Sequence, residues 1–337
     1  MNLEAMFAQE WQGLDDALVR VAGLTPEPSF APADGRVLLS AMVDAHLATG
    51  GKRLRGLLPA AMVRAGGGPV AAAWTFGACV ELVHNGTLIH DDIQDGDALR
   101  RGKPTLWALH GAAQAINAGS ALYAAPLTTL ATDATLPEPL RGALCGLVGR
   151  ALVDTIAGQV ADLDLHGQID HDRETLRAVA VAKTAPLFAA VVAGAALLLG
   201  EPIRDASFVT ARSLGLAFQI RDDLLDLVGT KGRGAAGADL REGKLTLPIR
   251  YALDRAPADE RAALTALLAR AGGDDAVDDK EIAKWVQWVH DRGGVNEARD
   301  ELATLINDAT SAGRDALPAA SAAVLQAFAA RLGTLDG

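Results

Sequence analysis

The sequence predicts an all-α protein, organised as one domain of ten or more helices over residues 1–337. Half of the residues are hydrophobic, which is enough to build a large core. Stretches rich in Ala, Leu and Val recur at helical spacing, and no strand-like alternation of apolar and polar residues extends for any length. These patterns together favour a helical bundle.

Segments rich in Gly, Pro and Asp separate the expected helices, at residues 24–35, 64–69 and 270–279. The longest strongly apolar run without a charge is Thr184–Gly200. It has 17 residues and is rich in Ala and Gly, so we expect a buried helix and no stable membrane insertion. The N-terminal segment carries acidic residues and lacks an apolar core, so the sequence predicts a cytoplasmic protein.

One carboxylate spacing occurs twice in apolar, helix-like surroundings, in DDIQD and in DDLLD. The six aspartates are Asp91, Asp92 and Asp95, then Asp222, Asp223 and Asp226. In a helix, positions i and i+4 share a face and position i+1 lies about 100° around the axis. Each triplet is therefore expected to project its carboxylates from a single turn.

Two such sets of carboxylates facing each other would repel. Like charges about 4 Å apart cost roughly 4 kcal/mol per pair at an effective dielectric constant near 20, so cations are expected between them. Oxygen ligands select hard ions, and Mg²⁺ takes one or two carboxylates and completes its shell with water and substrate phosphate. The motifs therefore predict Mg²⁺ bound by all six aspartates.

Basic residues surround these motifs and indicate what the metal ions hold. They are Lys52 and Arg55 in GGKRLRG, Arg100 and Arg101 after the first motif, Lys183 in AKTAP, and Lys244 at the end of ADLREGK. Arg suits bidentate recognition of phosphate, and Lys supplies a point charge. The sequence lacks a glycine-rich phosphate loop of the GxxxxGKS type, so a diphosphate held by metal ions is favoured over a nucleotide.

From about Leu38 to Leu332 the chain resembles the trans-isoprenyl diphosphate synthases, also called polyprenyl synthetases. The resemblance rests on six motifs in the family's order: GGKRLRG, the segment from Glu81 to Thr105, GQVADLD, Lys183-Thr184, FQIRDDLLD and GADLREGKLTLP. It implies an enzyme with an isoprenoid synthase-type helical bundle around a central cavity, in a homodimer. It also implies a cofactor of three Mg²⁺ ions in each active site.

The resemblance also implies a reaction and a role for each motif residue. An allylic diphosphate ionises with help from Mg²⁺, and isopentenyl diphosphate attacks the resulting carbocation. The allylic diphosphate is expected on Arg100, Lys183 and Lys244, with Thr184 and Gln219 near the cation. Isopentenyl diphosphate is expected on Lys52, Arg55, His84 and Arg101.

The length of the product is set, in this family, on the helix that precedes the first motif. Bulky residues four or five positions before the first aspartate form a floor, and this chain has Thr87 and Gly86 there. The first large group further along is Phe76, roughly 22 Å from Asp91 at 1.5 Å per residue. The resemblance therefore predicts a product of twenty carbons or more, such as geranylgeranyl diphosphate or a longer polyprenyl diphosphate.

Other functions remain open at this point. A net charge of −11 argues against a nucleic-acid partner. A class I terpene cyclase, a prenyltransferase with an unusual acceptor and a non-catalytic synthase subunit remain as alternatives. A basic residue that the family usually carries before Asp239 is missing here, and the sequence leaves open whether Lys231 or Arg233 replaces it.

Overall fold

A computed structural model describes residues 7–23, 39–165, 168, 170–229, 236–271 and 277–335. These residues form helices apart from one small hairpin, of strands β1 (Leu99–Arg100) and β2 (Lys103–Pro104), which pair antiparallel. The prediction of an all-α fold with more than ten helices is confirmed for the described part of the chain. Lys231 and Arg233 lie outside the described residues.

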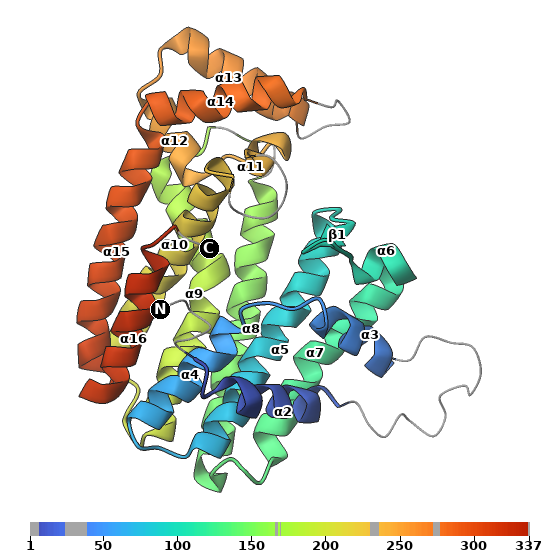
Figure 1. The fold of residues 1–337 in the computed structure, drawn as a ribbon, viewed down its shortest axis with the longest axis vertical. Helices are drawn as coiled ribbons and strands as arrows, with labels where there is room; N and C mark the ends of the chain where they lie inside the picture. The colour runs from blue at the N-terminus through green and yellow to red at the C-terminus, as the bar shows by residue number, and fades with distance from the viewer. Residues whose placement is uncertain are drawn as a thin grey trace. The chain divides into compact units, whose positions relative to one another are not determined.

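The helices follow in chain order (Figure 1). They are α2 (Trp11–Ala22), α3 (Leu39–Leu47), α4 (Leu54–Ala65), α5 (Val70–Gln94), α6 (Leu106–His110), α7 (Ala112–Thr132), α8 (Glu138–Asp164), α9 (Arg173–Leu198), α10 (Asp205–Leu227), α11 (Ala238–Arg241), α12 (Leu247–Asp254), α13 (Ala258–Ala271), α14 (Asp279–Asp291), α15 (Gly294–Ala316) and α16 (Ala319–Leu332).

The chain divides into two compact units, each described here by itself. Unit 1 comprises Met1–Val153, Leu187–Phe208 and Ala312–Phe328, and unit 2 comprises Asp154–Pro186, Val209–Ser311 and Ala329–Gly337. Within α9 the division falls at Pro186, which removes a backbone hydrogen bond from the helix. The expectation of one domain over the whole chain stays a prediction.

The core of unit 1 is built around α5, which lies beside α7 in Figure 1. Aromatic rings fill its centre: the ring of Phe328 lies 6.4 Å from that of Phe7 and 6.3 Å from that of Phe188. Phe76 is fully buried and packs against α9 at Gly194, where an added Cβ would lie 2.1 Å from the ring. Burial of several large rings fixes the path of α5 and hence the position of its C-terminal end.

Unit 2 has its own apolar cluster, which joins α10 to the short helices after it. Leu224, Tyr251, Leu268 and Val289 are among its fully buried members. At the periphery, Glu260 of α13 accepts hydrogen bonds from Trp288 of α14 (2.7 Å) and from Arg292, the residue that follows α14 (2.5 Å). These contacts pin the α13–α14 pair together.

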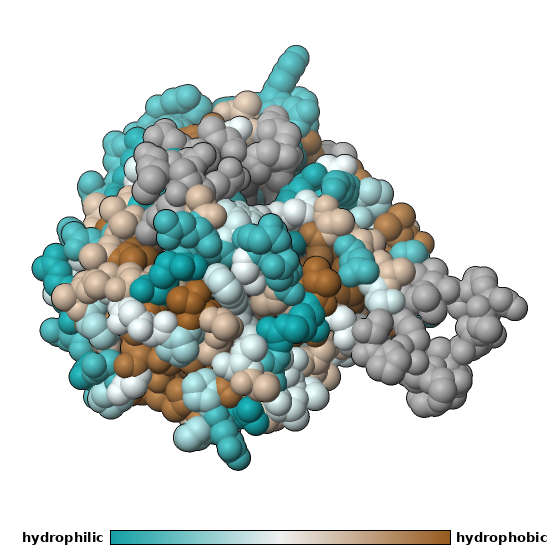
Figure 2. Space-filling view, turned by 60° about the horizontal axis from the view of Figure 1, so that its bottom comes forward, coloured by the Kyte–Doolittle hydropathy of each residue, from teal (hydrophilic) through white to brown (hydrophobic). Residues whose placement is uncertain are grey.

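Two helices, α8 and α9, are long and apolar enough to cross a membrane by length and composition. Of the most apolar window of α9, 67% is buried, which is typical of a core helix in a protein without membrane spans. On the face shown in Figure 2, hydrophobic residues occur as separate patches between hydrophilic ones. The expected buried helix at 184–200 therefore agrees with the end of α9.

Candidate active site

The first aspartate motif lies at the C-terminal end of α5, in unit 1. Asp91 and Asp95 share one face of the helix and remain at least partly exposed, whereas Asp92 is 2% exposed. The carboxylate of Asp92 instead meets the guanidinium of Arg100, with Oδ1 2.6 Å from Nη2 and 2.7 Å from Nε. These two charge-assisted contacts to one carboxylate oxygen anchor the β1–β2 hairpin to the motif.

The carboxylates of this motif suit a hard divalent ion that also binds the substrate. Among the described residues, no three carboxylate, imidazole or thiolate groups converge on one point. A pair of carboxylates one helical turn apart, such as Asp91 and Asp95, matches the partial protein ligand set of Mg²⁺, which keeps water and substrate phosphate in its shell. Direct binding by all three aspartates stays a prediction.

The hairpin and the GGKRLRG loop are fastened together beside this motif. Arg101 donates to the carbonyl of Gly50, and Lys103 Nζ donates to the carbonyl of Ala48 at 2.6 Å. The Arg101 guanidinium lies over Gly51, where φ is +142° and a Cβ would come within 2.7 Å of Nη1. Only glycine admits both this backbone conformation and this approach.

Arg55 and His84, both predicted to bind isopentenyl diphosphate, meet in the same unit. Arg55 Nη1 lies 3.1 Å from His84 Nε2, and the Arg55 guanidinium stacks over the Phe188 ring at 5.1 Å. Burial, followed by the charges of Arg55 and Arg100, holds the pKa of His84 well below its usual value. Because a guanidinium only donates, His84 is neutral, accepts at Nε2 and carries its proton on Nδ1.

A group of buried polar side chains that no sequence motif indicated lies against this loop. Arg53, at φ +46° before α4, donates to the carbonyl of Leu47 at 2.7 Å and to Asn85 Oδ1 at 3.3 Å. Glu81 accepts the amide of Gly56 at 3.1 Å. His46 is also buried, its Nε2 lacks a hydrogen-bond partner, and burial with the charge of Arg100 lowers its pKa to about 3. These groups could be identified only from their burial close to arginines, and that burial depends on tertiary contacts.

The second motif lies on α10, in unit 2, and its three aspartates differ in exposure. Asp222 is half-buried, whereas Asp223 and Asp226 are 3% and 2% exposed. Gln219 Nε2 donates to Asp223 Oδ1 at 2.8 Å. Asp226 accepts the backbone amides of Ala238 and Asp239 at 3.1 and 3.2 Å, and so caps α11. Asp226 therefore holds the chain that leads to Lys244.

Two predicted phosphate-binding lysines of unit 2 are paired with carboxylates. Lys183 Nζ lies 2.8 Å from Asp162 Oδ2, and Lys244 Nζ lies 2.7 Å from Glu242 Oε2. Both lysines keep partial exposure. Thr184 is buried and donates to the Ala180 carbonyl at 2.5 Å, in the turn before Pro186.

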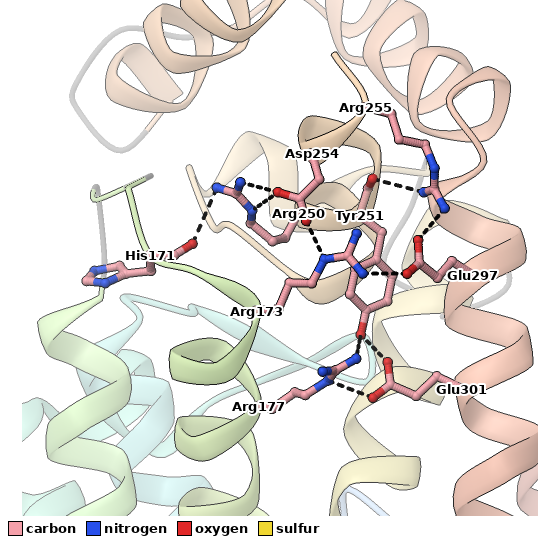
Figure 3. A network of polar contacts seen from close by, with 9 residues as sticks. All are labelled: His171, Arg173, Arg177, Arg250, Tyr251, Asp254, Arg255, Glu297 and Glu301. Carbon is pink, nitrogen blue, oxygen red and sulfur yellow. Dashed lines mark hydrogen bonds and ion pairs between the residues drawn. The ribbon is translucent and has the colours of Figure 1, made fainter.

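A polar network supports α9, the helix that carries Lys183 (Figure 3). Arg173 of α9 bonds to Asp254 of α12 and to Glu297 of α15, and its guanidinium lies 4.6 Å from the Tyr251 ring centre. Arg177 pairs with Glu301 at 2.8 Å. The network ties the start of α9 to α12 and α15, and so braces the segment that leads to Lys183.

Residues predicted to set product length lie in unit 1 along α5. Gly86 packs against α7, where an added Cβ would lie 2.7 Å from the ring of Tyr123 and 3.0 Å from the Gly119 carbonyl. Tyr123 also hydrogen-bonds to His90 Nδ1 at 3.2 Å. Thr87 is half-buried and donates to the His84 carbonyl at 2.7 Å. A tyrosine of α7 therefore occupies the space next to Gly86.

The all-α architecture, with aspartates at a helix end and arginines fastened beside them, defines a protein of the isoprenoid synthase fold class. Residues 36–286 match the polyprenyl synthetase family. The matched range ends earlier than the resemblance to Leu332 seen in the motifs. The chain belongs to the polyprenyl synthetase family, and it is a prenyltransferase.

Individual relatives differ in the product that their names give. The chain is 36% identical to a geranylgeranyl diphosphate synthase of Cyanophora paradoxa, over 60% of this chain and 70% of that protein. It is 35% identical to a (2E,6E)-farnesyl diphosphate synthase of Mycobacterium tuberculosis, over 72% of this chain and 68% of that protein. A polyprenyl synthase of Caulobacter crescentus, solved with calcium and isoprenyl diphosphate, superposes with a TM-score of 0.80 at 26% identity, covering 98% and 96%.

Proposed function

We propose that this protein elongates an allylic diphosphate by condensation with isopentenyl diphosphate, in trans geometry, to a product of twenty carbons or more. One observation carries the proposal. The Asp92–Arg100 pair joins the first aspartate motif to the β1–β2 hairpin, and Arg101, which follows β1, donates a hydrogen bond to Gly50 of the GGKRLRG loop. Carboxylates for a metal–diphosphate complex and cations for a second diphosphate therefore lie on connected elements of unit 1.

Two separate sets of residues, each containing basic side chains, bind the two substrates. Arg100, Lys183 and Lys244 bind the allylic diphosphate, and Lys52, Arg55, His84 and Arg101 bind isopentenyl diphosphate. Asp91, Asp95 and Asp222, the more exposed members of the two motifs, offer the ligands for three Mg²⁺ ions. When bound, Mg²⁺ neutralises the charge that grows on the departing diphosphate.

Chain elongation then follows without a protein nucleophile. Breaking the allylic C–O bond leaves an allylic carbocation, and the double bond of isopentenyl diphosphate supplies the electron pair for the new C–C bond. Loss of a proton restores a double bond, so the product is five carbons longer. Gln219 and Thr184 support the cation through their polar atoms.

Further proposals concern the product, the assembly and the location. The named product of the Cyanophora relative supports twenty carbons or more. The exposed apolar side chains of Val153, Ile156 and Val160 on α8 support a homodimer. The burial of α9 supports a cytoplasmic enzyme without stable membrane insertion.

Replacement of Asp91 tests the metal role. We expect Asp91→Ala to lower turnover at least about 100-fold, because a missing ligand weakens charge stabilisation in the transition state. Asp308→Ala, which removes an exposed carboxylate of α15, serves as the matched control. Turnover is measured as pyrophosphate release, and folding by circular dichroism. A folded Asp91→Ala protein with wild-type turnover would refute the assignment.

A further inference from the structure

Glu81 is a buried carboxylate that none of the substrate roles above includes. It lies on α5, is 4% exposed, and precedes the first aspartate motif by more than two helical turns. A charged group at this depth is costly unless it is paired and hydrogen-bonded. Its partners therefore indicate why the carboxylate is there.

The Glu81 side chain holds three groups around the GGKRLRG loop. Its Oε2 accepts the amide of Gly56 at 3.1 Å. Its Oε1 accepts Asn85 Nδ2 at 3.3 Å and lies 3.9 Å from Arg53 Nη1. Asn85 in turn accepts from Arg53 Nη1 at 3.3 Å.

Arg53 connects Glu81 with the segment that precedes the loop. Arg53 has φ +46°, a backbone conformation that is unfavourable for a residue with a side chain. Its Nη2 donates to the Leu47 carbonyl at 2.7 Å. Lys52, which is exposed, directly precedes Arg53, and Arg55, which meets His84, follows two positions later in the first turn of α4. The contacts of Glu81 thus hold the chain at Arg53, which follows Lys52, and at Gly56, which follows Arg55.

We propose that Glu81 is a positioning residue for isopentenyl diphosphate: it does not touch the substrate, but it holds Arg53 and the Gly56 amide so that Lys52 and Arg55 face the diphosphate together. This inference rests on the proposed function. It assigns to one carboxylate the preorganisation of a single substrate site, so its loss affects one substrate and spares the other.

The test compares two buried carboxylates of unit 1. Glu81→Gln keeps a hydrogen-bond acceptor but removes the charge. Glu10→Gln is the matched control, because Glu10 is 3% exposed and pairs with Arg64 at 2.7 Å, but has no contact with the loop. For each variant, the KM for isopentenyl diphosphate, the KM for farnesyl diphosphate, kcat and the melting temperature are measured.

Glu81→Gln is expected to raise the KM for isopentenyl diphosphate about tenfold, with less than about a twofold change in the KM for farnesyl diphosphate. Glu10→Gln is expected to leave both KM values unchanged, even where it lowers the melting temperature. An unchanged KM for isopentenyl diphosphate in Glu81→Gln, or an equal rise for both substrates, overturns the inference.

A second variant keeps the test decisive if Glu81→Gln does not fold. Arg53→Gln removes the same contact from the loop side and is expected to show the same selective rise in KM. A folded Arg53→Gln protein with an unchanged KM for isopentenyl diphosphate likewise overturns the inference. Failure of the proposed function is distinguishable, because the wild-type protein would then incorporate no isopentenyl diphosphate at all.

Discussion

Single residues of unit 1 show how tertiary contacts change the chemistry of a side chain. His46 lies 3% exposed among groups that include Arg100, Asn85, Arg53 and Arg101. Burial is the largest cause that lowers its pKa to about 3, and the nearby arginines add to it. His46 is therefore neutral throughout the physiological pH range.

The neutral state of His46 predicts a pH dependence of stability. Its folded pKa of about 3 lies below the 6.5 of the unfolded chain, so the unfolded state takes up a proton as the pH falls below 6.5 while the folded state does not. Stability is therefore lost from pH 6.5 downward, by up to about 1.4 kcal/mol per pH unit for one such histidine. Urea unfolding of the wild type and of His46→Gln at pH 7.5 and 5.5 measures this loss. Equal losses in the two proteins would contradict the account.

The aspartate motifs could be predicted at this scale because their spacing is local. Asp91 and Asp95 lie one turn apart in any helix, so the sequence alone placed them on one face. The partners of Lys183 and Arg53 could not be predicted in the same way. Asp162 and Glu81 lie more than 20 positions away from them in sequence, and only the packing of helices brings them into contact.

At the scale of elements, the contact between α5 and α7 limits the size of the side chain that fits at position 86. Gly86 and Gly119 face each other closely, and Tyr123 fills the adjacent space. The sequence showed a glycine and suggested open room beside it. Tyr123 of α7 places an aromatic ring beside position 86, where α5 itself has none. No pattern within the sequence of α5 could reveal this ring.

This contact predicts the outcome of moving the aromatic ring between helices. Gly86→Phe alone is expected to overpack the α5–α7 contact and to lower stability by about 1–3 kcal/mol. The double variant Gly86→Phe/Tyr123→Ala keeps the total volume and places the ring on α5, so it is expected to fold and to give a shorter product. Urea unfolding and mass spectrometry of the products measure both effects. A folded double variant with the wild-type product would show that the floor lies elsewhere.

At the scale of the whole molecule, α8 presents an apolar stripe with spacings of three and four residues. Val153, Ile156 and Val160 are 60%, 44% and 56% exposed. Nearer the N-terminus of α8, an added Cβ at Gly142 or Gly146 would meet nothing within 4 Å. Small and apolar residues at these spacings are typical of a helix that packs against another helix.

The stripe predicts that the proposed homodimer depends on α8. Val153→Asp/Ile156→Asp is expected to shift the protein from dimer to monomer, because charges would be buried without partners in the interface. Val19→Asp, at a site 75% exposed on α2, is the matched control. Sedimentation or light scattering measures the mass. A dimeric Val153→Asp/Ile156→Asp protein would exclude this face as the interface.

The central claim is elongation of an allylic diphosphate by isopentenyl units. Its most direct test is incubation of the purified protein with Mg²⁺, labelled isopentenyl diphosphate and farnesyl diphosphate, with the products sized by mass spectrometry. Chain elongation predicts labelled products that grow in steps of five carbons and end at twenty carbons or more. Release of diphosphate without incorporation of the label would contradict it.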